Sequence, residues 1–153
     1  MISIAMNKAF VREPDADARV SCPRCGGLAL EVAGCVLDVH VPAAIRGRLG
    51  AVAWCCRNSG CEVIYFDLFE QRVLVSELCG AVYPKDLSAP ICACFGLTME
   101  EIEADLRAGE PLRIRELYRK SQSGEARCSE LAVDGRCCMG EVQRLYLRGR
   151  GSN

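Results

Sequence analysis

The sequence predicts an α+β fold in which a small β-rich module precedes a helical module. Short runs rich in valine, leucine and aromatic residues fill the first half, whereas helix start and stop signals fill the second half. The 12 cysteines also fall into two groups, on either side of the linker-like segment YPKDLSAP at residues 83–90. We therefore predict a β-rich module at 1–86, a helical module at 87–148 and a flexible tail at 149–153.

The β-rich module contains five short apolar runs with the character of strands. Each run is bounded by turn-forming or polar residues, as is typical of strands in a small sheet. One further segment, PAAIRGRLG at 42–50, predicts a turn of helix. The predicted strands are 28–32, 35–41, 51–56, 62–69 and 71–78.

Local signals in the helical module fix where its helices begin and end. Thr98 followed by Glu101 fits a capping box, in which each side chain accepts a hydrogen bond from the other residue's backbone N–H. Gly109 predicts the end of that helix, and Pro111 suits the first turn of the next helix. The last helix begins directly after a pair of adjacent cysteines. The predicted helices are 99–109, 111–120 and 139–148.

The charge balance and the residue composition exclude several classes of function. With 19 basic and 20 acidic residues the net charge is −1, which gives no electrostatic support for nucleic-acid or membrane-surface binding. No apolar run is long enough to span a bilayer, and the first residues lack a secretory signal, so we expect no membrane insertion and a cytoplasmic protein. Nor does the sequence contain a nucleophile–base pair or a phosphate-binding loop, so we do not expect an enzyme.

Cysteines this numerous in a reducing compartment predict metal ligands rather than disulfides. The single histidine favours sites made of thiolates alone. Such sites suit zinc and iron–sulfur clusters, and they disfavour a catalytic zinc ion with histidine ligands.

The first group of cysteines predicts a structural zinc site in a zinc-ribbon-like module. Cys22 and Cys25 form a Cys-x-x-Cys metal knuckle, followed by two glycines that turn backbone N–H groups toward the sulfurs. Cys56 and Cys61 can complete a tetrahedral site, although Cys55 can take the place of Cys56. Four thiolates close the coordination sphere, so this zinc would stabilise the fold and carry out no catalysis.

The second group of cysteines predicts a redox-active 2Fe–2S cluster, which needs four thiolates. Cys92-Ala-Cys94 supplies two of them, and the candidates downstream are Cys128, Cys137 and Cys138. Helix N-termini follow both ligand groups, where N–H groups and the helix dipole stabilise the negative charge of a cluster. The alternative is that these cysteines are ordinary buried or free thiols.

Two resemblances sharpen this prediction. The segment ICACFGLTMEEIEADLRAG resembles the opening of the bacterioferritin-associated ferredoxin-like (BFD-like) 2Fe–2S domain, although that family closes its site with Cys-x-x-Cys and here nine residues separate Cys128 from Cys138. The succession of CPRC, CRNSGCEVIYFD, Cys-x-Cys and CSELAVDGRCCMGEV, over residues 20–146, resembles the N-terminal domain of CopZ-type copper chaperones. We expect the Cu(I)-carrying domain of those chaperones to be absent.

The resemblance to the chaperone domain implies a complete set of ligands for both metals. The second cysteine of its GRCC motif is a cluster ligand, which selects Cys138 over Cys137. The implied zinc ligands are Cys22, Cys25, Cys56 and Cys61. The implied cluster ligands are Cys92, Cys94, Cys128 and Cys138.

Eight assigned ligands leave four cysteines, which we interpret as follows. Cys35 and Cys79 lie in strand-like runs and are predicted to be core residues. Cys55 and Cys137 each neighbour a ligand and are predicted to be small buried residues, with a role as alternate ligands or soft-metal ligands left open.

Three other features have ordinary structural interpretations. His40 is predicted to occupy an ordinary strand position, and Trp54 is predicted to pack over the zinc module. The basic residues Arg113, Arg115, Arg119 and Lys120 predict a solvated helix face, on which an acidic redox partner can also dock.

Taken together, these features predict an electron-transfer protein with a 2Fe–2S cluster and a structural zinc ion. By analogy with the family, it would serve metal homeostasis by supplying one electron to a copper ion, a copper-handling protein or another redox partner protein. The alternative is a soft-metal binding or sensing module without redox chemistry.

Overall fold

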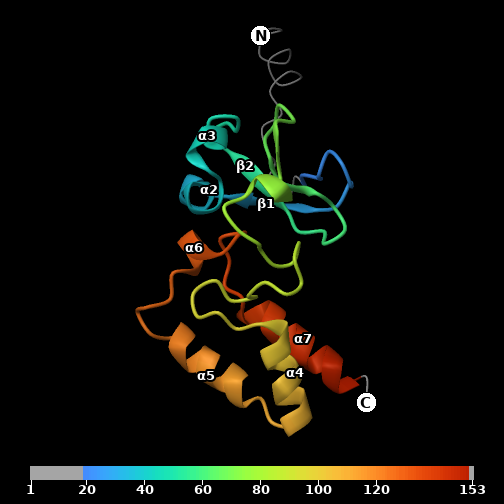
Figure 1. Ribbon diagram of the computed structural model, residues 1–153, viewed down its shortest axis with the longest axis vertical. Coiled ribbons are helices and arrows are strands. Elements are labelled where there is room, and N and C mark those ends of the chain that lie inside the picture. The colour runs from blue at the N-terminus through green and yellow to red at the C-terminus, as the bar shows by residue number, and fades with distance from the viewer. Residues whose placement is uncertain (1–18, 152–153) are drawn as a thin grey trace, which may run out of the picture.

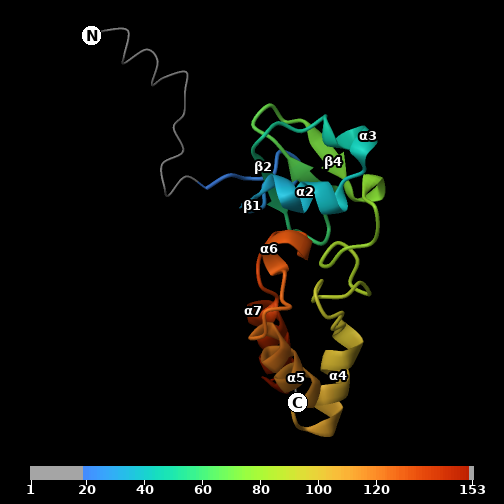
Figure 2. The ribbon, with the colours of Figure 1, turned by 90° about the vertical axis from the view of Figure 1, so that its left-hand side faces the viewer.

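The computed structural model describes residues 19–151, and these form two modules that lie end to end (Figures 1 and 2). A β module forms one end, and helices α4 (Met99–Ala108), α5 (Leu112–Ser121) and α7 (Met139–Gly151) form the other. The short helix α6 (Cys128–Leu131) lies between them, next to the β module. No helix in this part of the chain has the length and apolar character that crossing a membrane requires.

The β module is built on a four-stranded antiparallel sheet in the order β1-β2-β3-β4. Every residue of β2 and β3 is buried, because each face of the sheet is covered by a separate hydrophobic core. Four of the five predicted strands are confirmed. The observed strands are β1 (Ala29–Val32), β2 (Ala53–Cys56), β3 (Val63–Phe66) and β4 (Arg72–Leu74), the last followed by a 3-10 turn, η1 (Val75–Glu77).

The predicted strand at 35–41 is wrong, because this segment forms helix α2 (Gly34–His40). Its alternating apolar residues resemble a strand, but the adjacent residues Val36 and Leu37 are both fully buried in one core. Adjacent side chains of a strand point to opposite faces, whereas a helix can bring both to the same side. The predicted turn of helix at 42–50 is confirmed as α3 (Ala43–Arg46).

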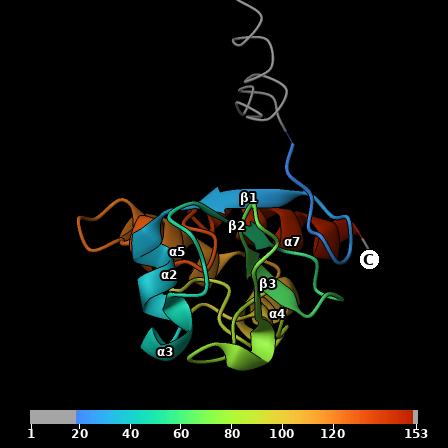
Figure 3. The same ribbon diagram turned by 90° about the horizontal axis from the view of Figure 1, so that it is seen from above.

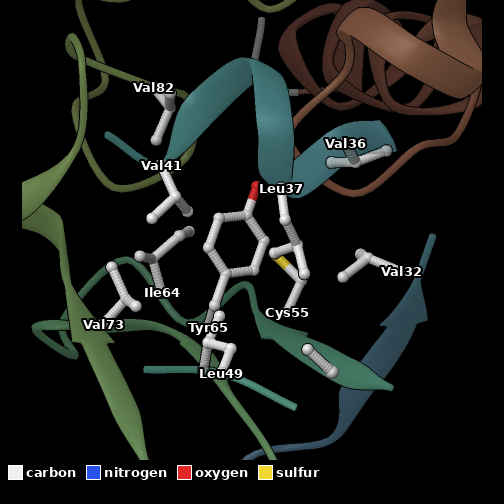
Figure 4. Close-up of a cluster of buried hydrophobic side chains, with 11 residues drawn as sticks. Val32, Val36, Leu37, Val41, Leu49, Cys55, Ile64, Tyr65, Val73 and Val82 are labelled. Carbon is white, nitrogen blue, oxygen red and sulfur yellow. The ribbon is translucent and has the colours of Figure 1, made fainter. Parts of the chain in front are cut away.

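The larger core of the β module lies between the sheet and α2, and Tyr65 stands in its middle (Figure 4). Seen from above, α2 and α3 lie together beside the sheet (Figure 3). The Tyr65 ring is completely buried, and its hydroxyl points out of the core toward the other module, where it donates to the Val133 carbonyl at 2.6 Å. Tyr65 therefore links this core to the other module by a hydrogen bond.

The helical module begins and ends its first helix as predicted. The Thr98 hydroxyl accepts a hydrogen bond from the Glu101 N–H at 3.3 Å, and Gly109 ends α4 with a φ of 76°, in the left-handed region. No local pattern predicted a role for Asp105, which is completely buried. Its carboxylate accepts hydrogen bonds from the N–H groups of Arg113 and Ile114, and so caps α5 from the neighbouring helix.

The predicted tail at 149–153 is wrong for its first residues, because α7 continues to Gly151. A Cβ at Gly149 would lie 2.5 Å from Leu106 Cδ1, so this residue allows α7 to pack closely against α4 along its full length. Residues 152–153 of the predicted tail lie outside the described part of the chain.

Candidate metal centres

The four cysteines of the first group converge on one point. The sulfurs of Cys22, Cys25, Cys56 and Cys61 all lie within 4.8 Å of one another. The Sγ atoms of Cys22 and Cys61 are 3.9 Å apart, and those of Cys25 and Cys56 are 3.7 Å apart. A zinc ion bound by four sulfurs at about 2.3 Å has S···S edges of about 3.8 Å, so this donor set fits zinc.

A tight loop presents the first two of these sulfurs. The Cys22 N–H donates to the Gly27 carbonyl at 2.8 Å, and Gly26 takes a φ of 73°, which favours glycine. The Gly27 N–H then donates to Cys25 Sγ at 3.3 Å. Hydrogen bonding by the Asn58 side chain, and secondarily by the Gly27 N–H, lowers the pKa of Cys25 to about 6, which favours the thiolate that a metal needs.

The alternation of strand β2 separates Cys56 from Cys55. Cys56 belongs to the small core that contains the other zinc-site cysteines, together with Trp54 and Phe66. Cys55 is buried in the opposite core, against α2. Because successive side chains of a strand point to opposite faces, only Cys56 can reach the first site.

Lys85, which sequence reasoning missed, lies against the first site. Its ammonium group donates to Cys56 Sγ at 3.4 Å and to the carbonyl oxygens of Asn58 and Cys61 at 2.7 and 3.0 Å. One positive charge next to four thiolates offsets part of the negative charge that a zinc tetrathiolate carries. No local pattern announces this role, because Lys85 lies in the segment between the modules.

The second group of cysteines forms two pairs instead of one cluster. The Sγ atoms of Cys94 and Cys128 are 3.5 Å apart, and the Cys138 thiol lies close enough to Cys92 to lower the pKa of the Cys92 thiol. In the described residues these four sulfurs do not gather within the 4.8 Å that unites the first group. Two sulfur pairs on two neighbouring points suit a centre with two metal ions better than a centre with one.

The register of α7 selects Cys138 over Cys137 as the partner of Cys92. Cys138 precedes the helix by one residue and packs on the same core as Val142 and Tyr146, which follow it at intervals of four. Cys137 is exposed, and its thiol also lies close to that of Cys128. The Cys137 side chain is therefore next to the second site but, unlike Cys138, does not pack on the helical core.

Backbone N–H groups donate to one sulfur of each pair. The Phe95 N–H donates to Cys92 Sγ, and the Arg127 N–H donates to Cys94 Sγ, both at 3.3 Å. The loop after Cys92 turns at Gly96, whose N–H donates to the Cys92 carbonyl at 2.9 Å. The hydrogen bonds to Cys92 and Cys94 thus come from loop residues and not, as the sequence had suggested, from the N-terminus of α4.

The thiols of the second site differ in acidity. The hydrogen bond with Cys138 lowers the pKa of Cys92 to about 6, and the same hydrogen bond together with burial raises the pKa of Cys138. Burial, followed by the hydrogen bond with Cys94, raises the pKa of Cys128 to about 12. Metal binding at this site would therefore release protons, and it would be favoured by higher pH.

A cavity of about 320 Å³ separates the two modules next to the second site. Cys92 and Cys138 line one wall, and Arg57 from the β module lines another. Arg57 Nε lies 3.2 Å from Asp134 Oδ2 as an ion pair, although this N–H makes no hydrogen bond in the described part of the chain. The cavity and its charged groups thus lie directly between the two groups of cysteines.

The remaining cysteines differ from one another in burial. Cys55 is completely buried, as predicted, whereas the predictions for Cys35, Cys79 and Cys137 are wrong because these three are exposed. Cys35 lies on α2 and not in a strand, and Cys79 lies beyond the last strand. These two thiols therefore lie outside the hydrophobic core in which the strand-like pattern had placed them.

The other residues that the sequence singled out are placed as follows. His40 ends α2, and its Nε2 lies 2.7 Å from the Leu131 carbonyl, so the predicted strand position is wrong. Trp54 is buried against the first site and stacks on Phe66 with ring centroids 6.3 Å apart, as predicted. The basic residues of α5 include Arg113, which pairs with Asp105, and Arg119, which pairs with Glu116.

Comparisons with known proteins support the fold. No protein-family model matches the chain, and no curated protein matches its sequence. Among solved structures, the chain is similar to the X-ray structure of the Archaeoglobus fulgidus CopZ N-terminal domain, with a TM-score of 0.69 and 21% sequence identity. The match covers 82% of this chain and 97% of that one, so the chain has a CopZ N-terminal-domain-like fold.

Proposed function

We propose that this chain is a metal-binding, electron-transfer protein with a structural zinc ion and a 2Fe–2S cluster. The observation that carries the proposal is the difference between the two groups of cysteines, since one set of four sulfurs meets at a single point, whereas the other does not and contains the close pair Cys94 and Cys128. In this proposal the domain boundary near residue 86 separates a zinc-binding module from a cluster-binding module. No substrate turnover is proposed, so the protein would not be an enzyme.

The zinc site would stabilise the β module. Zinc would be held by Cys22, Cys25, Cys56 and Cys61, whose S···S distances of 3.7 and 3.9 Å suit a tetrahedral ion. Three of these cysteines are buried within the smaller core, so the ion would also join the knuckle loop to the sheet. A small sheet with few aromatic residues gains much of its stability from such a metal.

The cluster site would supply the redox chemistry. Cys92 and Cys138 would bind one iron, and Cys94 and Cys128 the other, and a bound 2Fe–2S cluster would accept and donate one electron at a time. Hydrogen bonds from Phe95 N–H and Arg127 N–H to the sulfurs would stabilise the reduced, more negative state. This assignment agrees with the resemblance of the helical half to the BFD-like ferredoxin domain.

Copper handling is the most specific role that we propose for this electron. The similar solved structure is named as a CopZ domain, and the sequence motifs resemble those of CopZ-type copper chaperones. The partner would be a copper ion, a copper-handling protein or another redox protein in the cytoplasm. Cu(II) bound as a substrate near the cluster would take up the electron and become Cu(I), while the cluster is oxidised by one electron.

Metal analysis and electron paramagnetic resonance of anaerobically purified protein test the proposal. We expect one zinc and two irons per chain, together with a visible absorbance that dithionite bleaches and a mild oxidant restores. Protein that contains zinc or copper but no iron would refute the redox function and would favour a soft-metal binding module.

A matched pair of variants tests the ligand assignment. Cys138→Ala should abolish the iron signal and leave the zinc content at one per chain, because it removes one sulfur of a pair and leaves the first site untouched. Cys137→Ala should leave both metals in place, because Cys137 is exposed and the resemblance to the chaperone domain assigns the ligand to Cys138. Iron loss in Cys137→Ala together with iron retention in Cys138→Ala would contradict the assignment.

A further inference from the structure

The loop that joins two cluster-site cysteines is anchored on the β module. Residues 129–136 lie between Cys128 and Cys138. The Leu131 carbonyl lies 2.7 Å from His40 Nε2, and the Val133 carbonyl accepts the Tyr65 hydroxyl at 2.6 Å. Figure 2 shows α6, where this loop begins, resting against the end of α2. The β module thus supplies partners to the backbone of the loop.

The same loop also packs tightly on α2. Gly135 has a φ of 70°, and a Cβ at this position would lie 3.2 Å from Val36 Cγ2. A side chain here would both strain the backbone and crowd the helix. The loop therefore depends on a close and specific fit to α2.

A charged contact links the loop to the zinc-site segment. Asp134 pairs with Arg57 at 3.2 Å, and Arg57 directly follows the zinc-site residue Cys56. The Asp134 carboxylate is buried and also accepts the Arg136 N–H at 3.0 Å, so it shapes the loop just before Cys138. The ion pair between Arg57 and Asp134 therefore links the turn that contains Cys56 to the loop that leads into Cys138.

A second link runs through the segment between the modules. Lys85 holds Cys56 Sγ and two carbonyl oxygens of the zinc-site turn, and Cys92 follows seven residues later. Tyr83 in the same segment donates to the Glu141 carboxylate at 2.8 Å, at the start of α7. The segment that leads into Cys92 is thus attached to the zinc-site turn through Lys85, and to the start of α7, the helix that follows Cys138, through Tyr83.

We propose that the zinc site and the cluster site are energetically coupled, with Arg57 and Tyr65 as the positioning residues that transmit the coupling. This inference rests on the proposed function for the identity of the second metal centre. Zinc would fix the turn that contains Cys56, and that turn and the core around Tyr65 would hold loop 129–136 so that Cys128 and Cys138 face their partners. Zinc loading would therefore precede and favour cluster loading.

Coupling of this kind is reciprocal. If zinc increases the affinity for the cluster by some factor, the cluster must increase the affinity for zinc by the same factor. Outer-shell contacts that orient metal ligands typically change metal affinity by about tenfold or more. We therefore expect zinc removal to speed iron release to a chelator by about tenfold.

The test measures two quantities in protein with and without zinc. The first is the rate of iron release from the reconstituted protein, and the second is the alkylation rate of Cys128 and Cys138 in iron-free protein. The double variant Arg57→Gln/Tyr65→Phe should lose most of the zinc dependence of both rates while still binding one zinc. It should also change the g-values of the reduced cluster, which a general loss of stability would not do.

Two control variants separate positioning from general effects. Arg24→Gln removes the exposed ion pair of Arg24 with Glu62, which flanks the zinc cysteines but touches no part of loop 129–136. Val73→Ala weakens the core around Tyr65 and keeps the Tyr65 hydroxyl and the Arg57–Asp134 ion pair. Both controls should keep the wild-type zinc dependence.

The outcomes distinguish a failure of this proposal from a failure of the proposed function. If the wild-type protein never binds iron, the proposed function fails, but zinc should still slow alkylation of Cys128 and Cys138. If zinc leaves the alkylation rate unchanged, or if Arg57→Gln/Tyr65→Phe keeps the full wild-type zinc dependence, the coupling is refuted whether or not a cluster forms.

Discussion

The hydroxyl of Tyr65 offers the sharpest test of how the two modules hold together. Tyr65→Phe removes one oxygen and keeps the ring, so the core between the sheet and α2 retains its packing. What is lost is the hydrogen bond of 2.6 Å to the Val133 carbonyl in the loop of the other module. The expected effect is therefore that of one hydrogen bond, with no cavity left behind.

The magnitude follows from the surroundings of the two partners. A hydrogen bond of this type contributes about 1 kcal/mol net, and an acceptor left buried without a donor adds to the loss. The Val133 carbonyl belongs to a half-buried residue, so we expect the free energy of unfolding to fall by about 1 to 2 kcal/mol. For a chain of this size the melting temperature should fall by about 3 to 6 °C.

Urea unfolding at a fixed concentration of free zinc measures this change. Trp54, the single tryptophan, reports on the β module by fluorescence, and far-ultraviolet circular dichroism reports on the helices. The matched control is Tyr146→Phe, which removes the hydroxyl of another buried tyrosine in the helical core. No hydrogen bond of the Tyr146 hydroxyl is present among residues 19–151, so we expect a loss below about 0.5 kcal/mol.

Two results would refute the reasoning. An unchanged urea midpoint in Tyr65→Phe would mean that the contact with Val133 contributes nothing to stability. An equal loss in Tyr146→Phe would mean that the effect comes from the removal of any buried hydroxyl and not from the link between the modules.

Three further predictions concern ionisation, backbone conformation and thiol access. Burial raises the pKa of Tyr65 above its ordinary value, so its contribution to stability is fully present below about pH 10 and is lost as the pH rises further; the free energy of unfolding should therefore fall less steeply above pH 10 in Tyr65→Phe than in the wild type. Gly109→Ala forces a side chain into the left-handed region at the end of α4 and should cost about 1 kcal/mol in urea unfolding. In metal-loaded protein, mass spectrometry after brief alkylation should find Cys35 and Cys79 labelled and Cys55 protected, and labelling of Cys55 first would contradict its burial.

Local sequence signals predicted the elements that local forces determine. Thr98 and Gly109 bound α4 as expected, because a cap depends only on residues within one turn of the helix end. The prediction of a strand at 35–41 was wrong because strands and short buried helices can share the same alternation of apolar and polar residues. Only the packing of the segment decides between them. The prediction of Cys35 as a core residue followed from the same error.

The contacts between the modules could not be predicted from the sequence. Arg57 and Asp134 are 77 positions apart, and neither lies in a pattern that announces an ion pair. Lys85 appeared only as part of a linker, yet its ammonium group lies against Cys56. Such contacts depend on where two independently patterned modules meet, and no spacing rule within either module contains that information.

The choice between Cys137 and Cys138 shows how the helix register determines what the cysteine spacing leaves open. Both are thiols, and from spacing alone either could pair with Cys92. Residues that follow one another on a helix differ in direction by about 100°, and α7 must bury Val142 and Tyr146 against α4 and α5. The Cys138 carbonyl accepts the Val142 N–H at 2.9 Å, so Cys138 is held at the start of the helix against the same core, whereas the adjacent Cys137 is exposed. Inserting one residue between Cys138 and Met139 should therefore move Cys138 to the exposed position that Cys137 now occupies, and it should remove the pairing of Cys138 with Cys92.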